Sequence, residues 1–427
     1  MENTNSLNKS KLMQNKFRFV IMVASAALIY GLPYFKSYYY DAYREVFNLT
    51  NTQIGALGSI YGVFGMISYL FGGVLADKVS ARKLVSFSLV VTGLGGLAHL
   101  AKPSYLVLIC IYAFWGISSL LTFWPAFVKG IRSLANPDEQ GKAFGLMEGG
   151  RGVVNAIHLA IAVAIFGYIT QKSNNAAGIN GVILFYSLVT IALGILTFLL
   201  LKDEKIEASE KFRLASIVEI LKMPAVWIIT IILCASYTMN MSFYYFTPYA
   251  TEIFGTTAVL GAILTILAQY VRPFAAPIAG FTGDKIGRAK TIMVGFAVMA
   301  VSTALVICIP GSTKFVPLLI VGCILVYVAM YWNYGVIFSL LEDGGIPMAA
   351  SGTAIGFIST LGYLPEVFVP LIAGSMLDSL GAARGYRYYF TGVIIVLIIG
   401  FIATLVWMKT AAKNKKAKAE EAVVSQN

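Results

Sequence analysis

Long runs of apolar residues alternate with short polar segments along almost the whole chain. A window of about 19 residues finds twelve runs long enough to cross ~30 Å of hydrocarbon as a helix that rises ~1.5 Å per residue. The predicted spans are 17–43, 54–76, 84–101, 104–128, 143–169, 180–201, 225–250, 257–281, 291–310, 315–341, 351–373 and 386–408. Because lipid offers the backbone no hydrogen-bond partner, each run must satisfy its own amides and carbonyls as a helix. The pattern therefore predicts an all-α membrane protein with twelve transmembrane helices.

The longest polar connector divides these spans into two groups of six, which predicts two six-helix bundles. Its second part, 212–221, has an amphipathic rhythm suited to the membrane surface. The charged segment after Thr410 is expected to lack regular structure. The expected organisation is a tail at 1–16, a bundle at 17–201, a linker at 202–222, a second bundle at 223–410 and a tail at 411–427.

Composition supports the membrane class. Of the 427 residues, 58% are hydrophobic and 12% are charged, whereas an ordinary soluble domain carries about a quarter charged residues. The net charge of +12 does not indicate a nucleic-acid partner, because the Lys and Arg residues fall between the apolar runs. The sequence has no nucleotide-binding loop, zinc-protease motif or paired catalytic residues, so we expect no enzyme activity, cofactor or metal. The four cysteines lie inside spans as small apolar residues: Cys110, Cys234, Cys308 and Cys323.

The basic residues also predict the orientation. Placing the N-terminus inside puts most of them, including Lys78, Arg82 and Arg213, in cytoplasmic loops and tails. This arrangement satisfies the positive-inside rule, so both termini are expected to be cytoplasmic. The first apolar run lacks the short core and cleavage site of a signal peptide, so we expect it to be retained. The short loops and the Asn/Lys-rich start are compatible with a bacterial inner membrane.

A short motif recurs in the same loop of each predicted bundle. Segment 73–83 follows the second span and segment 280–290 follows the eighth, and both place a glycine four residues before Asp-Lys and a basic cluster after it. The matching positions are Gly73, Asp77 and Arg82 in the first copy and Gly280, Asp284 and Arg288 in the second. We expect the glycines to permit close helix approach, the aspartates to pair with a helix terminus or a basic residue, and the basic cluster to hold the loop at the anionic leaflet. One copy could be a basic stop signal, but two copies in register favour a repeat.

Twelve spans, a central linker and the paired motif resemble the major facilitator superfamily from about residue 16 to residue 409. Phe123-Trp124-Pro125 on the fourth span and the segments 352–357 and 361–364 on the eleventh resemble the organophosphate:phosphate antiporter branch and its organic-anion relatives. The resemblance implies a secondary transporter in which two pseudo-symmetric six-helix halves rock about a central site.

Ionisable side chains inside the spans are the main functional candidates, because burying each of them in the bilayer costs free energy. The basic ones are Lys36, Lys129, Arg151 and Arg272. Arg151 and Arg272 lie at matching depth, ~12 to 13 Å from the cytoplasmic ends of the fifth and eighth spans. The resemblance places these two helices opposite each other, and a guanidinium matches the oxygens of a carboxylate, phosphate or sulfonate bidentately. We therefore interpret both arginines as anion ligands. Lys129 either contacts substrate at the inner mouth or extends to the cytoplasmic headgroups.

Four polar residues of the fifth span recur at helical spacing: Glu148, Arg151, Asn155 and His158. They form one stripe, which we expect to face the transport path. Asn155 is a candidate substrate ligand and His158 a candidate proton carrier. The structural alternatives are that Arg151 only satisfies Glu148 and that His158 is a buried neutral histidine.

The second half of the chain offers a comparable group. Gln269, a candidate substrate ligand, lies one turn before Arg272, and Glu366 follows Pro365 on the eleventh span. Glu366 is the one acid clearly inside a span, so it is a candidate proton carrier. It could instead form an ion pair with Arg272 that substrate or proton binding would break.

Four more residues are expected to line the site: Tyr34 and Lys36 on the first span, and Tyr237 and Asn240 on the seventh. Tyrosines can donate hydrogen bonds to anions or stack on a substrate ring, whereas an aromatic belt at the outer interface is the alternative. In the antiporter branch, phosphate-holding arginines align with Tyr34 and Asn240, and a substrate-site histidine aligns with Arg151. This departure argues against phosphate exchange, while an arginine on the eighth helix resembles the oxalate:formate and monocarboxylate relatives.

The sequence therefore predicts a secondary active transporter for a small organic anion, such as a carboxylate, sulfonate or sugar acid, that works by alternating access. Proton symport and anion exchange both stay open. The alternatives are an organophosphate:phosphate antiporter, an exporter of amphiphilic drugs or lipids, and a solute sensor. The expected partners are the substrate, the bilayer and, for symport, protons; we expect a monomer with no nucleic-acid partner.

Overall fold

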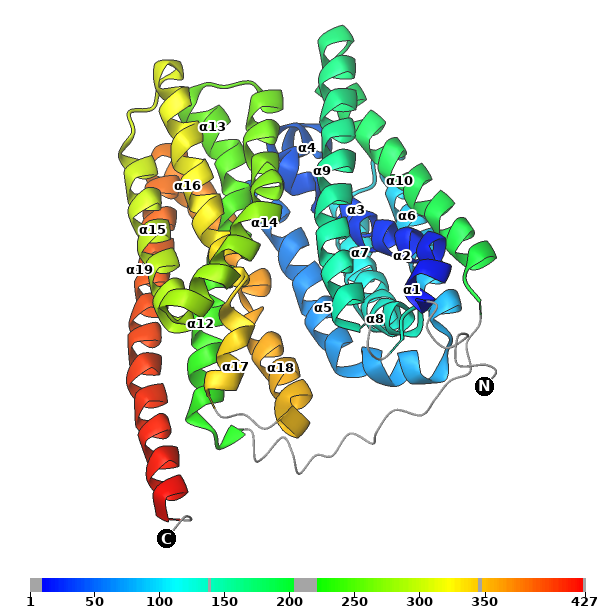
Figure 1. The fold of residues 1–427 in the computed structure, drawn as a ribbon. Coiled ribbons are helices and arrows are strands. Elements are labelled where there is room, and N and C mark those ends of the chain that lie inside the picture. Colours follow the sequence, from blue (N-terminus) through cyan, green and yellow to red (C-terminus); the bar gives the residue numbers. More distant parts are fainter. Residues whose placement is uncertain (1–9, 137–139, 203–220, 345–347, 425–427) are drawn as a thin grey trace. The chain divides into compact units, whose positions relative to one another are not determined.

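The computed structural model describes residues 10–136, 140–202, 221–344 and 348–424 (Figure 1). Within these ranges the chain is helical with short connections, and they contain no strand. The chain divides into two compact units, Met1–Glu210 and Lys211–Asn427, called unit 1 and unit 2 below. Most of the predicted linker, including its amphipathic part, lies outside the described residues.

Unit 1 holds the counterparts of the first six predicted spans. The first span comprises α2 (Lys16–Leu28), α3 (Gly31–Tyr38) and α4 (Tyr40–Phe47), preceded by the short α1 (Lys11–Gln14). The second and third are α5 (Asn51–Lys78) and α6 (Ala81–His99). The fourth comprises α7 (Tyr105–Gly116), the π-helix η1 (Ile117–Phe123) and α8 (Trp124–Ser133). The fifth and sixth are α9 (Gln140–Lys172) and α10 (Asn175–Leu200).

Unit 2 holds the counterparts of the other six. The seventh span comprises α12 (Pro224–Ser242), η3 (Phe243–Tyr245) and α13 (Phe246–Phe254). The eighth and ninth are α14 (Ala258–Ile286) and α15 (Arg288–Cys308). The tenth comprises η4 (Thr313–Phe315), α16 (Val316–Tyr334), η5 (Ile337–Ser339) and α17 (Leu340–Asp343). The last two are formed by α18 (Met348–Gly362) and α19 (Pro365–Val424).

The helices are long and apolar enough for a membrane protein. Nine helical stretches of the described chain meet the length and hydropathy needed to cross a bilayer, and the bent pair α2–α3 raises the number to ten. One of the nine, Ala354–Thr410, contains nearly all of the eleventh predicted span and all of the twelfth. The second predicted span corresponds to α5, whose 28 residues extend ~42 Å. Each predicted span therefore has a helical counterpart, and the predicted all-α class is confirmed.

Local capping chemistry determines where several helices begin. Thr50 accepts a hydrogen bond from the Gln53 amide while the Gln53 side chain accepts one from the Thr50 amide, so α5 starts with a capping box. Asn174 caps α10 and Thr257 caps α14 through the amides three residues later. These side chains satisfy amides that the first helical turn leaves without a partner.

The first span bends at the junction of α2 and α3, by 42°. Gly31 begins α3, and a Cβ placed there would lie only 2.6 Å from the ring of Tyr186 on α10. Because no side chain occupies that position, the Tyr186 ring packs directly against the bend. The close approach of ring and backbone holds the break of the first span against the sixth.

The fourth span contains a seven-residue π-helical stretch, η1, just before Pro125. Proline has no amide hydrogen, so the carbonyl one turn earlier loses its usual partner and the backbone widens locally. Hydroxyls of η1 donate to carbonyls of the preceding turn, Ser119 to Trp115 at 2.6 Å and Thr122 to Ser118 at 2.8 Å, and Ser119 also lies 3.0 Å from the Tyr61 hydroxyl on α5. The distortion therefore falls where hydroxyls of η1 contact α5.

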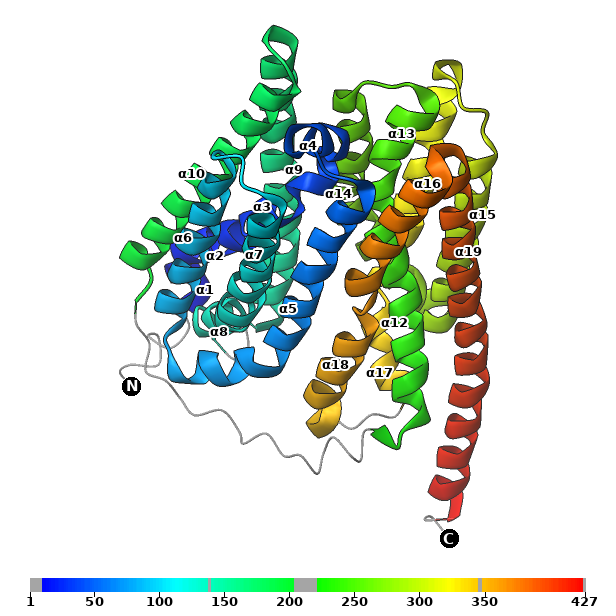
Figure 2. The ribbon, with the colours of Figure 1, turned by 180° about the vertical axis from the view of Figure 1, so that it is seen from behind.

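The eleventh span is broken and the twelfth is longer than expected. A two-residue gap separates α18 from α19, which begins at Pro365, a residue that cannot donate the helical hydrogen bond. Gly381 then adopts a positive φ of 72°, and the chain turns back, as Figure 2 shows for the orange and red parts of α19. Gly385 contacts Leu377 across this turn.

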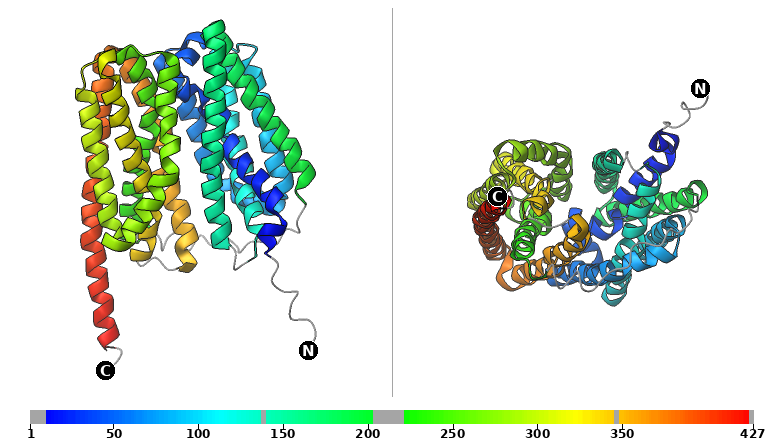
Figure 3. Two further views of the ribbon diagram at one scale, coloured as in Figure 1. Left: turned by 45° about the horizontal axis from the view of Figure 1, so that its top comes forward. Right: turned by 60° about the horizontal axis from the view of Figure 1, so that its bottom comes forward.

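The expectation that the segment after Thr410 lacks regular structure is wrong, because α19 continues to Val424. Figure 3 shows this part extending beyond the other helices of unit 2. The segment is rich in Ala, Lys and Glu, which are among the residues with the highest intrinsic helix propensity. A high charge alone therefore did not indicate disorder, because the propensity favours extension of the preceding helix.

Candidate functional site

The predicted stripe on α9 forms two separate groups of contacts. Arg151 donates a hydrogen bond to Glu148 at 2.8 Å, and its guanidinium lies 4.9 Å from the ring centroid of Trp124 on α8. The Arg151 side chain is only 12% exposed, whereas that of Glu148 is 48% exposed. The Glu148 carboxylate therefore stays hydrated, and the two residues do not form a fully buried ion pair.

Arg151 is not saturated by these contacts. Its Nε is buried and has no hydrogen-bond partner among the described residues. A guanidinium offers five N–H groups in a rigid fork, and the 2.8 Å contact to Glu148 uses one nitrogen. The alternative that Arg151 merely satisfies Glu148 therefore leaves part of the fork unexplained.

The second group of the stripe centres on His158, which is buried. Its Nδ1 lies 3.0 Å from the hydroxyl of Tyr186 on α10, and its Nε2 lies 3.1 Å from Oδ1 of Asn155. Both ring nitrogens are therefore occupied, as in a neutral imidazole that accepts from Tyr186 and donates to Asn155. This geometry links α9 to α10 and orients the Asn155 amide.

The two candidates of the first span lie in different surroundings. Tyr34 makes an edge contact with Tyr61 at 5.5 Å between ring centroids, next to the hydroxyls of η1. Lys36 is 6% exposed, and its Nζ lies 3.4 Å from Ser37 Oγ and 5.6 Å from the ring centroid of Tyr112. Lys36 is therefore a buried cation with an aromatic face beside it.

Unit 1 also contains a buried histidine that sequence reasoning missed. His99, the last residue of α6, stacks on Trp115 at 5.0 Å between ring centroids and lies 3.5 Å from the hydroxyl of Tyr43. Its Nδ1 contacts the carbonyl of Gly95 at 3.1 Å. The available signal was its place at the end of a predicted span, where an ionisable side chain needs a compensating partner.

In unit 2, Arg272 on α14 lies beside α16. Its guanidinium is 5.6 Å from the ring centroid of Tyr331, and the Gln269 side chain lies close to the Tyr331 hydroxyl. Gln269 is buried and lies one helical turn before Arg272. Gln269 and Arg272 therefore share Tyr331 as a neighbour.

Glu366 lies in the first turn of α19 and contacts the seventh span. The Tyr237 hydroxyl donates a hydrogen bond to its Oε2 at 3.0 Å. Tyr334 lies close enough to interact electrostatically with both Glu366 and Arg272. Asn240, one turn after Tyr237, directs its amide to the sulfur of Met330 at 3.8 Å. Unit 2 therefore brings four predicted candidates, Arg272, Glu366, Tyr237 and Asn240, to the same group of helices.

The described residues hold no group of three or more His, Cys, Asp or Glu side chains suited to a metal ion. The four cysteines have no disulfide partner in this part of the chain.

Comparison with known proteins decides the family. Residues 17–368 and 274–425 match the Major Facilitator Superfamily. The chain belongs to the Major Facilitator Superfamily. The family predicted from the paired motif is therefore confirmed, whereas the antiporter branch remains a hypothesis.

Several curated proteins are similar to this superfamily member. Inner membrane protein YihN of Escherichia coli K12 is 27% identical over 93% of this chain and 96% of its own length. Inner membrane protein YqcE of the same strain is 28% identical over 88% and 91%. "Probable nitrate transporter NarT" of Staphylococcus aureus strain Newman is 27% identical over 32% of this chain and 33% of its own length.

Solved structures share the fold at low sequence identity. A bacterial homologue of the human lysosomal transporter Spinster, in an inward-facing and unoccupied conformation, has a TM-score of 0.73 at 12% identity and covers 94% of this chain and 97% of its own. The nucleoside transporter NupG has a TM-score of 0.72 at 12% identity, with 92% of this chain and 99% of its own covered. At such identities the likeness shows the superfamily fold alone.

In the repeated loop motif of this superfamily member, both arginines donate hydrogen bonds to backbone carbonyls. Arg82 donates to the carbonyl of Phe198 at 2.7 Å and lies over the Phe198 ring, at the last turn of α10. Arg288 donates to the carbonyl of Ser339 at 2.9 Å, at the end of η5. Both arginines therefore satisfy carbonyls that a helix end leaves without a hydrogen-bond partner.

The other motif positions differ from the expectation. No heavy atom lies within 4 Å of a Cβ built at Gly280, so among the described residues this glycine permits no close helix approach. Asp284 is exposed and forms no polar contact with the described residues, because Arg288 extends to η5 instead. Gly73 and the side chain of Asp77 lie outside the described residues.

Lys129 adds a third contact of this kind. Its Nζ donates to the carbonyl of Ala76 at 3.0 Å, in the last turn of α5. A cation at a helix C-terminus interacts favourably with the helix dipole. In this conformation Lys129 therefore stabilises the end of α5, a role that neither sequence alternative included.

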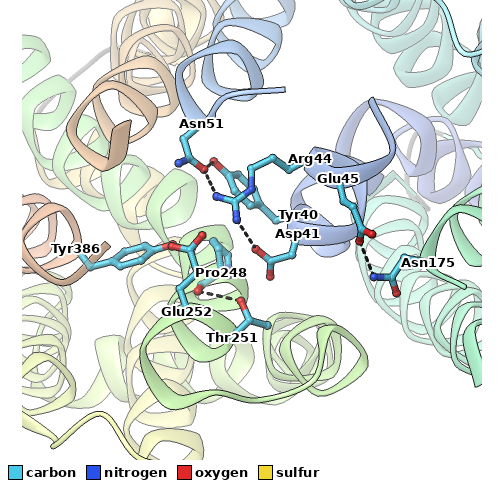
Figure 4. Close-up of polar contacts among 10 residues, drawn as sticks. All are labelled: Tyr40, Asp41, Arg44, Glu45, Asn51, Asn175, Pro248, Thr251, Glu252 and Tyr386. Carbon is cyan, nitrogen blue, oxygen red and sulfur yellow. Dashed lines mark hydrogen bonds and ion pairs between the residues drawn. The ribbon is translucent and has the colours of Figure 1, made fainter. Parts of the chain in front are cut away.

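In unit 1, α4 forms polar contacts with the helices beside it (Figure 4). Arg44 and the Tyr40 hydroxyl both donate to Oδ1 of Asn51 at 2.9 Å, and Asn175 donates to Glu45 at 2.7 Å. These bonds tie α4 to the starts of α5 and α10.

Unit 2 has its own polar contacts in the same view. The Tyr386 hydroxyl donates to Glu252 at 3.1 Å, which links α19 to α13 (Figure 4). Thr251 donates to the carbonyl of Pro248 at 3.0 Å within α13. These bonds stabilise helix ends of unit 2.

Proposed function

We propose that this protein is a secondary active transporter that moves a small organic anion, a carboxylate, sulfonate or sugar acid, by alternating access. The observation that carries the proposal is that each unit holds one intramembrane guanidinium beside an aromatic ring, Arg151 beside Trp124 and Arg272 beside Tyr331. Membership of a transporter superfamily supports the mode of action. Arg151 and Arg272 are the proposed anion ligands of the two units.

The physical basis is the cost of burying a charge. A guanidinium inside a span is stabilised when an aromatic face and a counter-charge surround it, and an anion supplies that counter-charge through two parallel hydrogen bonds. The buried Nε of Arg151 has no partner in the described part of the chain, so it is available to a ligand oxygen. Asn155, Tyr34 and Lys36 in unit 1, and Gln269, Tyr237 and Asn240 in unit 2, are the proposed additional ligands.

The proposal places the protein in a bacterial inner membrane as a monomer with both termini in the cytoplasm. The names of YihN and YqcE, which describe inner membrane proteins, support the location. The positive-inside distribution of Lys and Arg supports the orientation.

Energy coupling is proposed to use Glu366. Its hydrogen bond from Tyr237 stabilises the carboxylate, and proton binding would weaken that bond, so the protonation state of Glu366 can respond to a substrate bound nearby. His158 is the second candidate, but both of its nitrogens are already bonded. Anion exchange, which needs no proton carrier, is the competing mode. Counterflow of labelled substrate without a pH gradient tests it.

Two other functions are less well supported. Organophosphate exchange would be favoured by arginines at positions 34 and 240, where this chain has Tyr34 and Asn240. Export of cationic drugs would be favoured by an acidic interior, whereas Lys36, Arg151 and Arg272 make the intramembrane charge basic on balance. The name of NarT, which describes a nitrate transporter, adds support for an anion.

A thermal-shift screen of the detergent-solubilised protein tests the proposal directly. A ligand that binds only the folded state raises the Tm. We expect stabilisation by organic anions that is lost in Arg151→Ala and Arg272→Ala and kept in Arg384→Ala, an exposed arginine on α19. Stabilisation by cations or lipophilic compounds alone would contradict the anion assignment.

A further inference from the structure

A cluster of four tyrosines surrounds the charged residues of unit 2. We call it the tyrosine cluster: Tyr237, Tyr331, Tyr334 and Tyr363. The ring of Tyr237 lies 4.6 Å from that of Tyr363 and 6.5 Å from that of Tyr334, and Tyr331 lies 6.4 Å from Tyr334. Tyr363 stands in the gap between α18 and α19, so the cluster joins the broken eleventh span to α12 and α16.

Charged and amide groups lie against this cluster. Arg272 contacts the Tyr331 ring, Glu366 accepts from Tyr237, and the Gln269 side chain lies close to the Tyr331 hydroxyl. One guanidinium is enough for the charge of one anion. The remaining polar groups, a carboxylate, an amide and the tyrosine hydroxyls, therefore exceed what a small bare anion requires.

Two polar groups in this region, the Tyr334 hydroxyl and the Asn240 amide, have hydrogen-bonding capacity that the described protein atoms do not use. The hydroxyl oxygen of Tyr334 is buried and has no hydrogen-bond partner among the described residues. The Asn240 amide contacts a thioether sulfur at 3.8 Å, which is a weak acceptor. A buried polar group without a partner is unfavourable, so such groups in a native protein need water, an ion or a ligand to satisfy them.

We propose that unit 2 recognises a polyhydroxylated organic anion, that is, a sugar acid rather than a small bare carboxylate. Arg272 holds the acid group, the hydroxyls of Tyr334 and Tyr237 and the side chains of Asn240, Gln269 and Glu366 bond the substrate hydroxyls, and the tyrosine rings cover the apolar C–H faces of its carbon skeleton. Tyrosine is suited to this task because it combines a broad apolar face with a hydroxyl at its edge. The inference rests on the proposed function and narrows its substrate class.

The alternative is that the cluster is ordinary aromatic packing. Packing accounts for ring contacts, but it does not account for a buried hydroxyl without a partner in the described part of the chain or for the charged residues placed against the rings. A site built to bond substrate hydroxyls discriminates strongly against analogues that lack them, because its polar groups are then left unpaired. This asymmetry makes the two interpretations separable by experiment.

The test measures binding of matched ligands to the purified full-length protein by thermal shift and calorimetry. D-glucuronate and D-gluconate carry a carboxylate and several hydroxyls; cyclohexanecarboxylate keeps the ring and charge without hydroxyls; acetate keeps the charge alone; and D-glucose keeps the hydroxyls without charge. We expect at least one of the two sugar acids to bind about tenfold or more tightly than each of the other three ligands.

The outcomes separate this inference from the proposed function. Equal or tighter binding of cyclohexanecarboxylate or acetate overturns the inference and leaves anion transport standing. Binding of D-glucose with no response to any anion overturns both. D-glucose 6-phosphate is included as a further probe. If it binds more tightly than D-gluconate, the recognition of substrate hydroxyls is supported, but the assignment of a carboxylate or sulfonate as the acid group is overturned.

Variants at two positions test the residues. Tyr334→Phe removes only the buried hydroxyl, and we expect sugar-acid binding to weaken about fivefold to tenfold while cyclohexanecarboxylate binding is unchanged. Tyr363→Leu removes a ring and should weaken sugar-acid binding further, whereas Tyr363→Phe restores it in part. Tyr388→Phe, at an exposed position on α19, is the matched control. An equal loss for both ligands in Tyr334→Phe, or no loss at unchanged Tm, overturns the assignment.

Discussion

Arg151 and Arg272 are each held by an aromatic face, which restrains the plane of the guanidinium. Lysine keeps the positive charge but lacks the planar fork and its two parallel hydrogen bonds. We therefore expect Arg151→Lys and Arg272→Lys each to raise the apparent Kd for the transported anion about tenfold or more. Uptake in proteoliposomes, with Tm and abundance measured in parallel, checks this. A loss of folded protein that matches the loss of uptake would indicate a structural role instead.

Glu366 and His158 differ in what their partners allow. Glu366→Gln cannot exchange a proton, so we expect an inward proton gradient to stop accelerating uptake while counterflow continues. His158→Gln keeps a neutral donor and acceptor near Asn155 and Tyr186, so the response to the gradient should be retained. Uptake measured with and without the gradient distinguishes the variants. If Glu366→Gln still responds to the gradient, Glu366 is not the proton carrier; if the unmodified protein does not respond, anion exchange is favoured over symport.

At the scale of residues, the sequence predicted individual ionisable side chains better than their partners. Arg151, Arg272 and Glu366 stand out because charges are rare inside apolar runs. Helical spacing also indicated the Arg151–Glu148 contact, since both residues lie on one helix. It could not indicate Trp124 or Tyr331, because contacts between helices depend on how the helices pack.

The bend of the first span depends on a glycine. A Cβ at Gly31 would lie 2.6 Å from two ring atoms of Tyr186, so either the ring or the bend must move in Gly31→Ala. Overpacking of this kind costs about 1 to 3 kcal/mol, which we expect to appear as a lower Tm in detergent. Gly149→Ala is the matched control, because no heavy atom lies within 4 Å of a Cβ at that position. An unchanged Tm in Gly31→Ala would show that Tyr186 does not hold the bend.

At the scale of elements, the apolar runs predicted where the spans lie but not where they break. The π-helical stretch before Pro125 and the gap before Pro365 follow from the chemistry of proline. The prediction treated both segments as parts of continuous spans, because hydropathy averages over a window longer than the break. The helical tail was missed for a different reason, since its charge was weighed and its helix propensity was not.

Orientation belongs to the whole molecule, and labelling measures it. In a cysteine-free background, Ser312→Cys places a thiol in an exposed loop expected to face outward, and Lys285→Cys places one in the exposed last turn of α14, expected to face the cytoplasm. We expect a membrane-impermeant maleimide to label Ser312→Cys in intact cells and Lys285→Cys only after permeabilisation. Labelling in the opposite sense would reverse the proposed orientation and the proposed location of both termini.

At the scale of the whole molecule, the sequence predicted the family through a repeated motif rather than through any single site. The motif lies in corresponding loops of two six-span groups, and this arrangement is independent of the exact helix contacts. The physical roles of its residues were harder to predict. Arg82 and Arg288 bind carbonyls at helix ends that come from distant parts of their own units, which loop spacing does not encode.

The helical tail of α19 extends the twelfth span as one continuous helix. A helix rises ~1.5 Å per residue, so the stretch from Lys409 to Val424 projects ~22 Å, and a tilt of the span by about 10° would displace its tip by ~4 Å. A fluorophore rigidly attached near Val424 would therefore rotate with the span instead of tumbling on a loose tether. Polarised emission from such a probe would turn each transport cycle into an optical signal, recorded without altering any residue of the proposed binding sites.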